Sequence, residues 1–173
     1  MNKNNFFKSI IISSAIFIFA FVFLAIPNLV KASGLSVENV YNEVNQTRIQ
    51  NGQLALKKNN LLTLAAQRKA QDLISYGYWA HNNPTTGATP WKFILATGYR
   101  GRLAGENLGR DYGDTGSLIG AWLASPTHKQ NLLSNRYKET GIALATGVVN
   151  GQTRTVIVQM FGEPRQFISY RLQ

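Results

Sequence analysis

Two histidines and one glutamate are the side chains of this sequence whose surroundings indicate chemistry. His81 follows a run that contains Tyr78 and Trp79, where a helical pattern gives way to a polar loop. Glu106 lies among apolar residues and glycines, and a carboxylate in that setting needs a partner because burying an unpaired charge is costly. His128 is the second of the two histidines in the chain. Imidazole and carboxylate groups serve as general acids and bases or as ligands of a divalent cation.

Each of these residues also has an ordinary structural explanation. His81 can pack on its aromatic neighbours, and Glu106 can form a salt bridge or accept backbone hydrogen bonds. Ser125 precedes Pro126, so it suits a helix N-cap whose hydroxyl accepts from the backbone N–H of His128. A nucleophilic Ser125 with His128 as its base lacks the glycine pattern of a nucleophile elbow. The spacing of the two histidines and Glu106 matches no compact metal motif.

The composition limits which other kinds of site the chain can build. The 173 residues include no cysteine, which excludes disulfides, thiolate zinc sites, iron–sulfur clusters and cysteine nucleophiles. Eighteen Lys and Arg against 8 Asp and Glu give a formal charge of +10, which favours acidic partners. The basic residues form dispersed pairs without a nucleic-acid-binding motif. We therefore expect envelope polymer or lipid, and no nucleic acid, as the acidic partner.

Residues 1–32 indicate an export signal or an N-terminal membrane anchor. Lys3 and Lys8 precede a long apolar stretch within residues 10–30, and Ala32 supplies a small residue at the end. These are the parts of an export signal, although the apolar stretch approaches the roughly 20 residues of a membrane span. Cleavage after Ala32 and retention as an anchor both place the rest of the chain outside the cytoplasmic membrane. Membrane contact is expected only through residues 10–30, and only if they are retained.

Residues 33–165 predict one domain with helices first and a hairpin last. Helical spacing and capping residues predict helices at about 37–50, 60–76, 91–97, 115–125 and 126–133. Two β-leaning runs, 140–148 and 153–161, flank Asn150-Gly151, which predicts a hairpin. Residues 100–110 carry three glycines and are expected to be irregular, with at most a short strand. This order favours an α+β fold, followed by a C-terminal tail at 166–173.

Six segments stand in an order that is typical of a known family. They are Val44-Asn45-Gln46-Thr47-Arg48 with Leu54-Ala55-Leu56, Tyr78-Trp79-Ala80-His81, Gly105-Glu106-Asn107-Leu108, Trp122 with Ser125-Pro126-Thr127-His128, Gly141-Ile142-Ala143, and Gln159-Met160-Phe161-Gly162. Together they resemble the CAP superfamily, also called the SCP domain family, over roughly residues 37–163. The resemblance implies a three-layer α-β-α sandwich with a central antiparallel sheet.

The resemblance also implies a shared cleft for the candidate residues. The family places two histidines and two glutamates there, and His81, Glu106 and His128 match three of these positions. Ser125 stands where the second glutamate is expected, which resembles the bacterial SCP-like branch, and so does the absence of cysteine. The implied ligand set for Zn²⁺ or another divalent cation is therefore His81, His128 and Glu106.

Three functions are consistent with the sequence. In the first, the cleft of an exported domain binds a divalent cation, an envelope polymer, a lipid or a small ligand. In the second, a hydrolase of peptide or cell-wall substrates uses Glu106, His81 and His128 as catalytic residues. In the third, the chain is a structural or adhesive surface domain without cleft activity. We favour binding over catalysis because no complete catalytic unit can be read from the sequence, and we expect a monomer, either secreted or anchored to the membrane.

Overall fold

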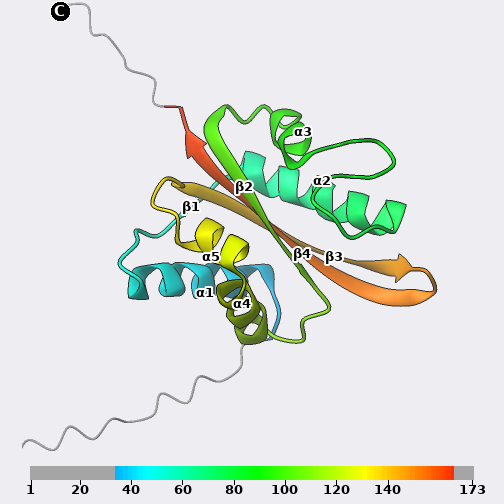
Figure 1. Cartoon of the computed structure of the whole chain (residues 1–173), viewed down its shortest axis with the longest axis horizontal. Helices are drawn as coiled ribbons and strands as arrows, with labels where there is room; N and C mark the ends of the chain where they lie inside the picture. Colours follow the sequence, from blue (N-terminus) through cyan, green and yellow to red (C-terminus); the bar gives the residue numbers. More distant parts are fainter. Residues whose placement is uncertain (1–33, 166–173) are drawn as a thin grey trace, which may run out of the picture.

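A four-stranded sheet in the order β1-β3-β4-β2 runs through the computed structural model, which describes residues 34–165 (Figure 1). The strands are β1 (Lys57–Lys58), β2 (Gly101–Arg110), β3 (Glu139–Val149) and β4 (Gln152–Pro164). The three long strands pair antiparallel, and the two-residue β1 joins β3 in parallel. The predicted α+β class with a largely antiparallel central sheet is confirmed.

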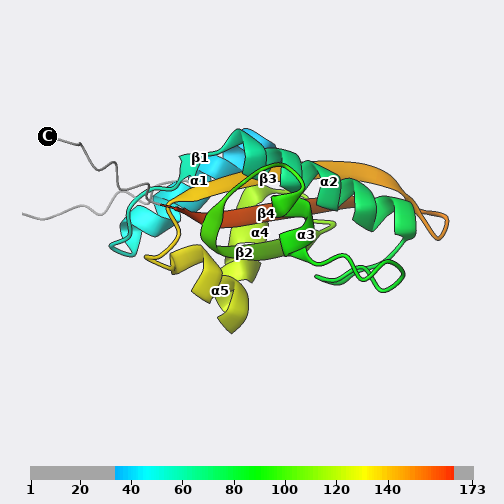
Figure 2. The ribbon, with the colours of Figure 1, turned by 90° about the horizontal axis from the view of Figure 1, so that it is seen from above.

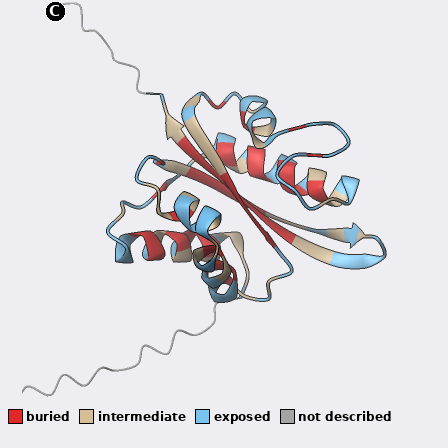
Figure 3. Cartoon of the chain, viewed as in Figure 1, coloured by how far each residue is buried: buried red, intermediate tan, exposed pale blue. Residues whose placement is uncertain are grey.

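Helices cover both faces of the sheet (Figures 1 and 2). They are α1 (Val37–Gln50), α2 (Asn60–Tyr76), α3 (Pro90–Leu95), α4 (Thr115–Ala124) and α5 (Pro126–Leu133). Alternate residues of β4 face opposite layers, as strand geometry requires. Ile157 and Phe161 pack in the hydrophobic cluster of α1, α4 and α5, whereas Val158 and Met160 pack in the cluster of α2 and α3. The buried residues accordingly line both faces of the sheet (Figure 3).

The helices begin where the sequence places capping side chains. Ser36 accepts from the backbone N–H of Asn39, and Asp114 accepts from that of Ser117. Helix α2 ends at Gly77, which adopts the left-handed conformation with φ of 64°. The predicted helices are confirmed, and α3 is shorter than its predicted range of 91–97.

The expectation of irregular chain at residues 100–110 is wrong, because β2 pairs with β4 along its length. Its glycines do not break the strand; they make room for side chains of the covering layers. A Cβ added at Gly105 would clash with the hydroxyl of Tyr137, and one at Gly109 would clash with Leu118. Strand β2 is therefore specified by residues far away in the sequence.

The β3–β4 hairpin follows its predicted turn. Asn150 and Gly151 both have positive φ, 51° and 74°, as the two central residues of an Asn-Gly hairpin turn require. The predicted export or anchor segment, residues 1–32, and the tail, residues 166–173, lie outside the described residues. No helix between Gly34 and Arg165 has the length and apolar character needed to cross a membrane.

Candidate functional site

A hydrogen bond between His81 and Glu106 forms the centre of the candidate site. His81 lies in the loop after α2, and Glu106 projects from the face of β2 that is covered by α2 and α3. The His81 Nδ1 and Glu106 Oε1 atoms are 2.6 Å apart. The Glu106 side chain is 2% exposed and that of His81 is 56% exposed. Because Nδ1 is engaged by the buried carboxylate, Nε2 is the ring nitrogen left to meet a ligand.

A buried lysine holds the loop that carries His81. Lys69 lies in α2 and is 0% exposed. Its ammonium donates to the backbone carbonyls of Ala80 and His81, at 3.1 and 2.7 Å, and to the Tyr78 hydroxyl at 2.7 Å. A buried charge is tolerated only with such partners. Lys69 thereby fixes the backbone of His81 against α2.

The same network continues into the polar loop beyond His81. Asp72 Oδ2 accepts from the Tyr78 hydroxyl at 2.5 Å and from the side-chain amide of Asn83 at 2.9 Å. Asn83 Oδ1 in turn accepts from the backbone N–H groups of Thr85 and Thr86, at 2.8 and 3.0 Å. The loop is thus held by α2 from both sides of His81.

The opposite face of β2 positions helix α5. The side-chain amide of Asn107 donates to the backbone carbonyl of His128 at 3.1 Å. Asn131 Nδ2 donates to Asn107 Oδ1 at 3.0 Å and to the backbone carbonyl of Glu106 at 3.1 Å. Neighbouring residues of one strand, Glu106 and Asn107, therefore hold the His81 loop on one face and α5 on the other.

The protonation of these groups follows from burial and pairing. Burial raises the pKa of Glu106, and the hydrogen bond with His81 and the Lys69 charge oppose that rise. The same hydrogen bond raises the pKa of His81 because it stabilises the imidazolium. Burial and the charge of His81 lower the pKa of His128. His81 therefore keeps its proton to a higher pH than His128 does.

His81 and Glu106 line a pocket of about 250 Å³. The other residues around it are Pro90, Trp91, Ala104, Gly105 and Asn131. His128 is not among the lining residues, although it lies three positions before Asn131 on α5, a spacing that places both on one side of a helix. The structure thus brings two of the three predicted residues into contact and holds the third on the neighbouring helix.

The predicted metal ligands are not gathered around one point. Between Gly34 and Arg165, no group of three or more His, Cys, Asp or Glu side chains could hold a metal ion. Glu106 Oε1 is engaged by His81, and Glu106 Oε2 is buried without a hydrogen-bond partner in this part of the chain. As placed, His81, His128 and Glu106 do not form a three-ligand site, and binding of Zn²⁺ or another divalent cation stays a prediction.

Ser125 occupies the predicted N-cap position of α5, but its hydroxyl does not cap the helix. No side-chain cap hydrogen bond is formed there, and Ser125 Oγ lies 3.3 Å from Thr127 Oγ1 instead. The prediction that the Ser125 hydroxyl accepts from the His128 N–H is therefore wrong. The backbone carbonyl of Ser125 still starts the helix by accepting from Lys129 at 2.9 Å.

Sequence reasoning missed the residues that position the site. Lys69 falls within the apolar stripe of α2, and a lysine at such a position signals a buried charge that needs acceptors. Asn107 directly follows Glu106 in the same segment, but nothing in the sequence alone shows that it reaches α5.

Comparisons with known proteins identify the family of the domain. The family model described as CAP, cysteine-rich secretory protein family, matches residues 41–161. The uncharacterized protein YkwD of Bacillus subtilis (strain 168) is 27% identical over 105 residues, covering 61% of this chain and 40% of that protein.

Solved structures share the fold. An extracellular protein with an SCP domain from Bacillus anthracis has a TM-score of 0.62 at 23% identity, covering 73% of this chain and 40% of that one. An outer surface protein from Borrelia burgdorferi has a TM-score of 0.63 at 21% identity, covering 78% of this chain and 99% of that one. The chain spans about 40% of the length of the two Bacillus proteins.

Proposed function

The chain belongs to the cysteine-rich secretory protein (CAP) family, and on that premise we propose that it is exported and binds a cell-envelope ligand in the His81–Glu106 pocket. Export is supported by the basic and apolar pattern of residues 1–32. Two proteins with similar structures are described as extracellular and as an outer surface protein. The domain would then lie outside the cytoplasmic membrane, either secreted or held by its N-terminal segment.

The observation that carries this proposal is the imidazole held by a buried carboxylate at the edge of a pocket. Glu106 fixes the His81 ring through Nδ1, so Nε2 is preoriented for a hydrogen bond. Trp91 and Pro90 form an apolar wall, and Asn131 adds its side-chain oxygen as an acceptor, since its amide N–H groups already donate to Asn107 and Glu106. A few oriented polar groups against an aromatic wall suit a polar ligand with one apolar face. The sugar rings of a wall glycan have this chemistry.

Sedimentation with insoluble peptidoglycan tests the binding. We expect full-length protein to pellet with purified peptidoglycan in 0.15 M and in 0.5 M NaCl, because a pocket contact is less screened than surface charge. His81→Gln and Trp91→Ala should each weaken binding about tenfold, the effect of losing a good hydrogen bond or an aromatic contact. Arg136→Gln, an exposed charge elsewhere, is the matched control. Equal binding by His81→Gln and wild type would overturn the proposal.

A divalent-cation version of this binding is favoured by one feature. A carboxylate that accepts from one ring nitrogen of a histidine is the arrangement often found behind a metal-bound imidazole. Calorimetric titration of ZnCl₂ into the full-length protein tests it. Equal heats for wild type and the His81→Ala/His128→Ala double variant would remove the metal version and leave the glycan version standing.

Hydrolysis is a second candidate, favoured by the raised pKa of the buried Glu106 carboxylate and by its contact with His81. A carboxylate buried this deeply would act through the imidazole, with Nε2 as the group that exchanges a proton with substrate or water. Labelled peptidoglycan and labelled casein are the probes. Turnover that persists in Glu106→Gln would contradict this role. If the wild-type protein showed no binding and no turnover, a structural or adhesive domain would be favoured.

A further inference from the structure

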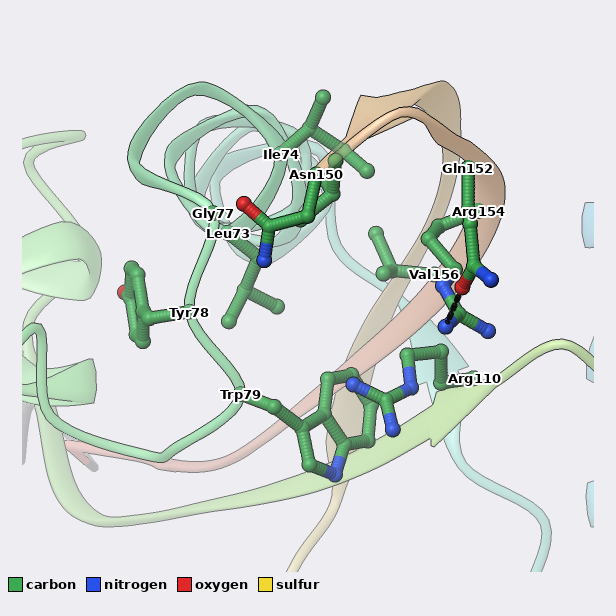
Figure 4. Close-up of a pocket in the computed structure, with 11 residues that line it drawn as sticks. Leu73, Ile74, Gly77, Tyr78, Trp79, Arg110, Asn150, Gln152, Arg154 and Val156 are labelled. Atoms are coloured by element: carbon green, nitrogen blue, oxygen red, sulfur yellow. Dashed lines mark hydrogen bonds between the residues drawn. The ribbon is translucent and has the colours of Figure 1, made fainter.

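A second pocket lies at the other end of the same strand face. Residues two apart in a strand share a face, so Arg110 lies on the Glu106 side of β2, about 13 Å further along at about 3.3 Å per residue. There the C-terminal end of α2, the segment after it and the β3–β4 turn enclose about 190 Å³ (Figure 4). Its floor includes Leu73 and Val156, which are 1% and 2% exposed.

Arg110 is held in this pocket by stacking and not by hydrogen bonds. Its guanidinium carbon lies 4.8 Å from the centroid of the Trp79 ring, and Figure 4 shows the two side chains together. Within residues 34–165 its salt-bridge contact is with Asp111, with Nε and Oδ2 3.7 Å apart. Among these described residues, the guanidinium N–H groups of Arg110 donate no hydrogen bond. A guanidinium that is oriented by stacking presents a planar fork of donors suited to an oxyanion.

Arg154 also lines the pocket and approaches the same Asp111 carboxylate as Arg110, but its guanidinium is already engaged. Its Nη1 lies 2.7 Å from Asp111 Oδ2, and its Nη2 donates to the side-chain oxygen of Gln152 (Figure 4). Asp111 is itself fixed by Thr155, whose backbone N–H donates to Oδ1 at 3.0 Å and whose carbonyl accepts from Asp111 at 2.8 Å. The single Asp111 carboxylate thus pairs closely with Arg154 and only weakly with Arg110, so these three groups together carry one positive charge in excess.

We propose that this pocket binds a singly charged oxyanion, a carboxylate or a phosphodiester, through Arg110. The Asn150 side chain also lines the pocket and adds an amide donor. The rest of the ligand would pack on Trp79 and the apolar floor. One unbalanced charge suits a monoanion better than a phosphate monoester, which carries about −1.5 to −2 at pH 7. This site is separate from the His81 pocket, so an experiment can refute one of the two binding proposals without refuting the other.

NMR spectroscopy of isotope-labelled full-length protein in a non-ionic detergent tests the site. N-acetylmuramic acid provides the carboxylate, dimethyl phosphate the phosphodiester and N-acetylglucosamine a neutral reference. We expect saturable shifts of the Arg110 Nε–H and Trp79 Nε1–H signals with one or both anions and none with the neutral sugar. Arg110→Gln should weaken binding about tenfold or more, the loss of a charged hydrogen bond. Arg136→Gln, which removes an exposed positive charge elsewhere, should not.

The anion that binds identifies the source of the oxyanion. Shifts with the carboxylate alone indicate a sugar acid or a peptide carboxylate, and shifts with dimethyl phosphate alone indicate a phosphodiester polymer. The proposal is overturned if neither anion shifts the Trp79 and Arg110 signals, or if Arg110→Gln and Arg136→Gln bind equally well. His81→Gln should leave these shifts unchanged, which separates the outcome from that of the peptidoglycan experiment.

Discussion

Glu106 and Arg110 lie on one face of one strand, yet their charged groups differ in burial and in pairing. The Glu106 side chain is 2% exposed and pairs with His81, whereas the Arg110 side chain is 40% exposed and stacks on Trp79. A buried charge must be compensated by fixed partners, so the residues around Glu106 determine local structure. An exposed charge carries little desolvation cost and can exchange water for a ligand. Substitutions around Glu106 should therefore lower the free energy of unfolding, whereas substitution of Arg110 should weaken ligand binding with little effect on stability.

The largest effect is expected for Lys69→Met, which removes the buried ammonium of the first pocket. The carbonyls of Ala80 and His81 lose their donor, and Glu106 loses a compensating charge. Removing one member of a buried charged network costs about 3–5 kcal/mol in the free energy of unfolding. Urea denaturation followed by circular dichroism measures it.

Lys92→Met is the matched control, because Lys92 is exposed on α3. It should change the free energy of unfolding by less than about 0.5 kcal/mol. If the two lysine variants lost the same stability, Lys69 would not be the residue that holds the His81 loop, and the contrast between the two pockets would be lost at its strongest point.

A smaller loss is expected for Gly105→Ala, on the opposite face of β2 from Glu106. The added methyl group would clash with the Tyr137 hydroxyl and crowd Asn131 Oδ1 at 3.0 Å. Overpacking of this kind costs about 1–3 kcal/mol and should disturb the Asn131 contacts that hold α5. Gly120→Ala in α4 meets nothing within 4 Å and should be neutral or stabilising by up to about 1 kcal/mol. Thermal melts that rank both variants alike would contradict the packing described for β2.

A still smaller effect concerns the pH dependence of the first pocket. Titration followed by NMR should give His81 a pKa above 6.5 and His128 a pKa below 6.5. Because the folded-state pKa of His81 is raised, its charged pair with Glu106 stabilises the fold below about pH 6.5, down to the pH at which Glu106, whose own pKa is raised by burial, takes up a proton. This contribution is lost as pH rises through the folded pKa. Glu106→Gln should lower the His81 pKa. An unchanged His81 pKa in that variant would show that the hydrogen bond does not control its protonation.

The elements predicted from sequence are those whose signals are local. Ser36 and Asp114 cap their helices, and Asn150-Gly151 makes its turn, because each acts on backbone a few residues away. Strand β2 could not be predicted in this way. Its glycines at 105 and 109 are explained only by Tyr137 and Leu118, which other elements place against the strand.

The same distinction applies to the candidate site. His81 and Glu106 were recognisable from residue type and family resemblance, and the structure joins them. Lys69 is visible in the sequence within the apolar stripe of a predicted helix. Its acceptors could not be predicted, because they are carbonyls of a loop whose path depends on the folded domain. The Arg110 pocket combines Trp79 with the β3–β4 turn, two regions that no sequence spacing links.

The smallest effect on stability is expected at the second pocket, and it is the sharpest test of the comparison. Arg110→Gln removes a stacked, exposed charge, and such a cation–π contact contributes about 0.5–1 kcal/mol. The weak approach to Asp111 adds little because water and salt screen it. Urea denaturation should therefore give a loss below about 1 kcal/mol, several times smaller than that of Lys69→Met, while anion binding falls about tenfold. A loss near 3 kcal/mol would make Arg110 a structural residue, because only a charge whose partners are buried and fixed costs that much to remove. Its position at the edge of the pocket would then serve the fold, and the division between a structural and a binding charge along β2 would be wrong.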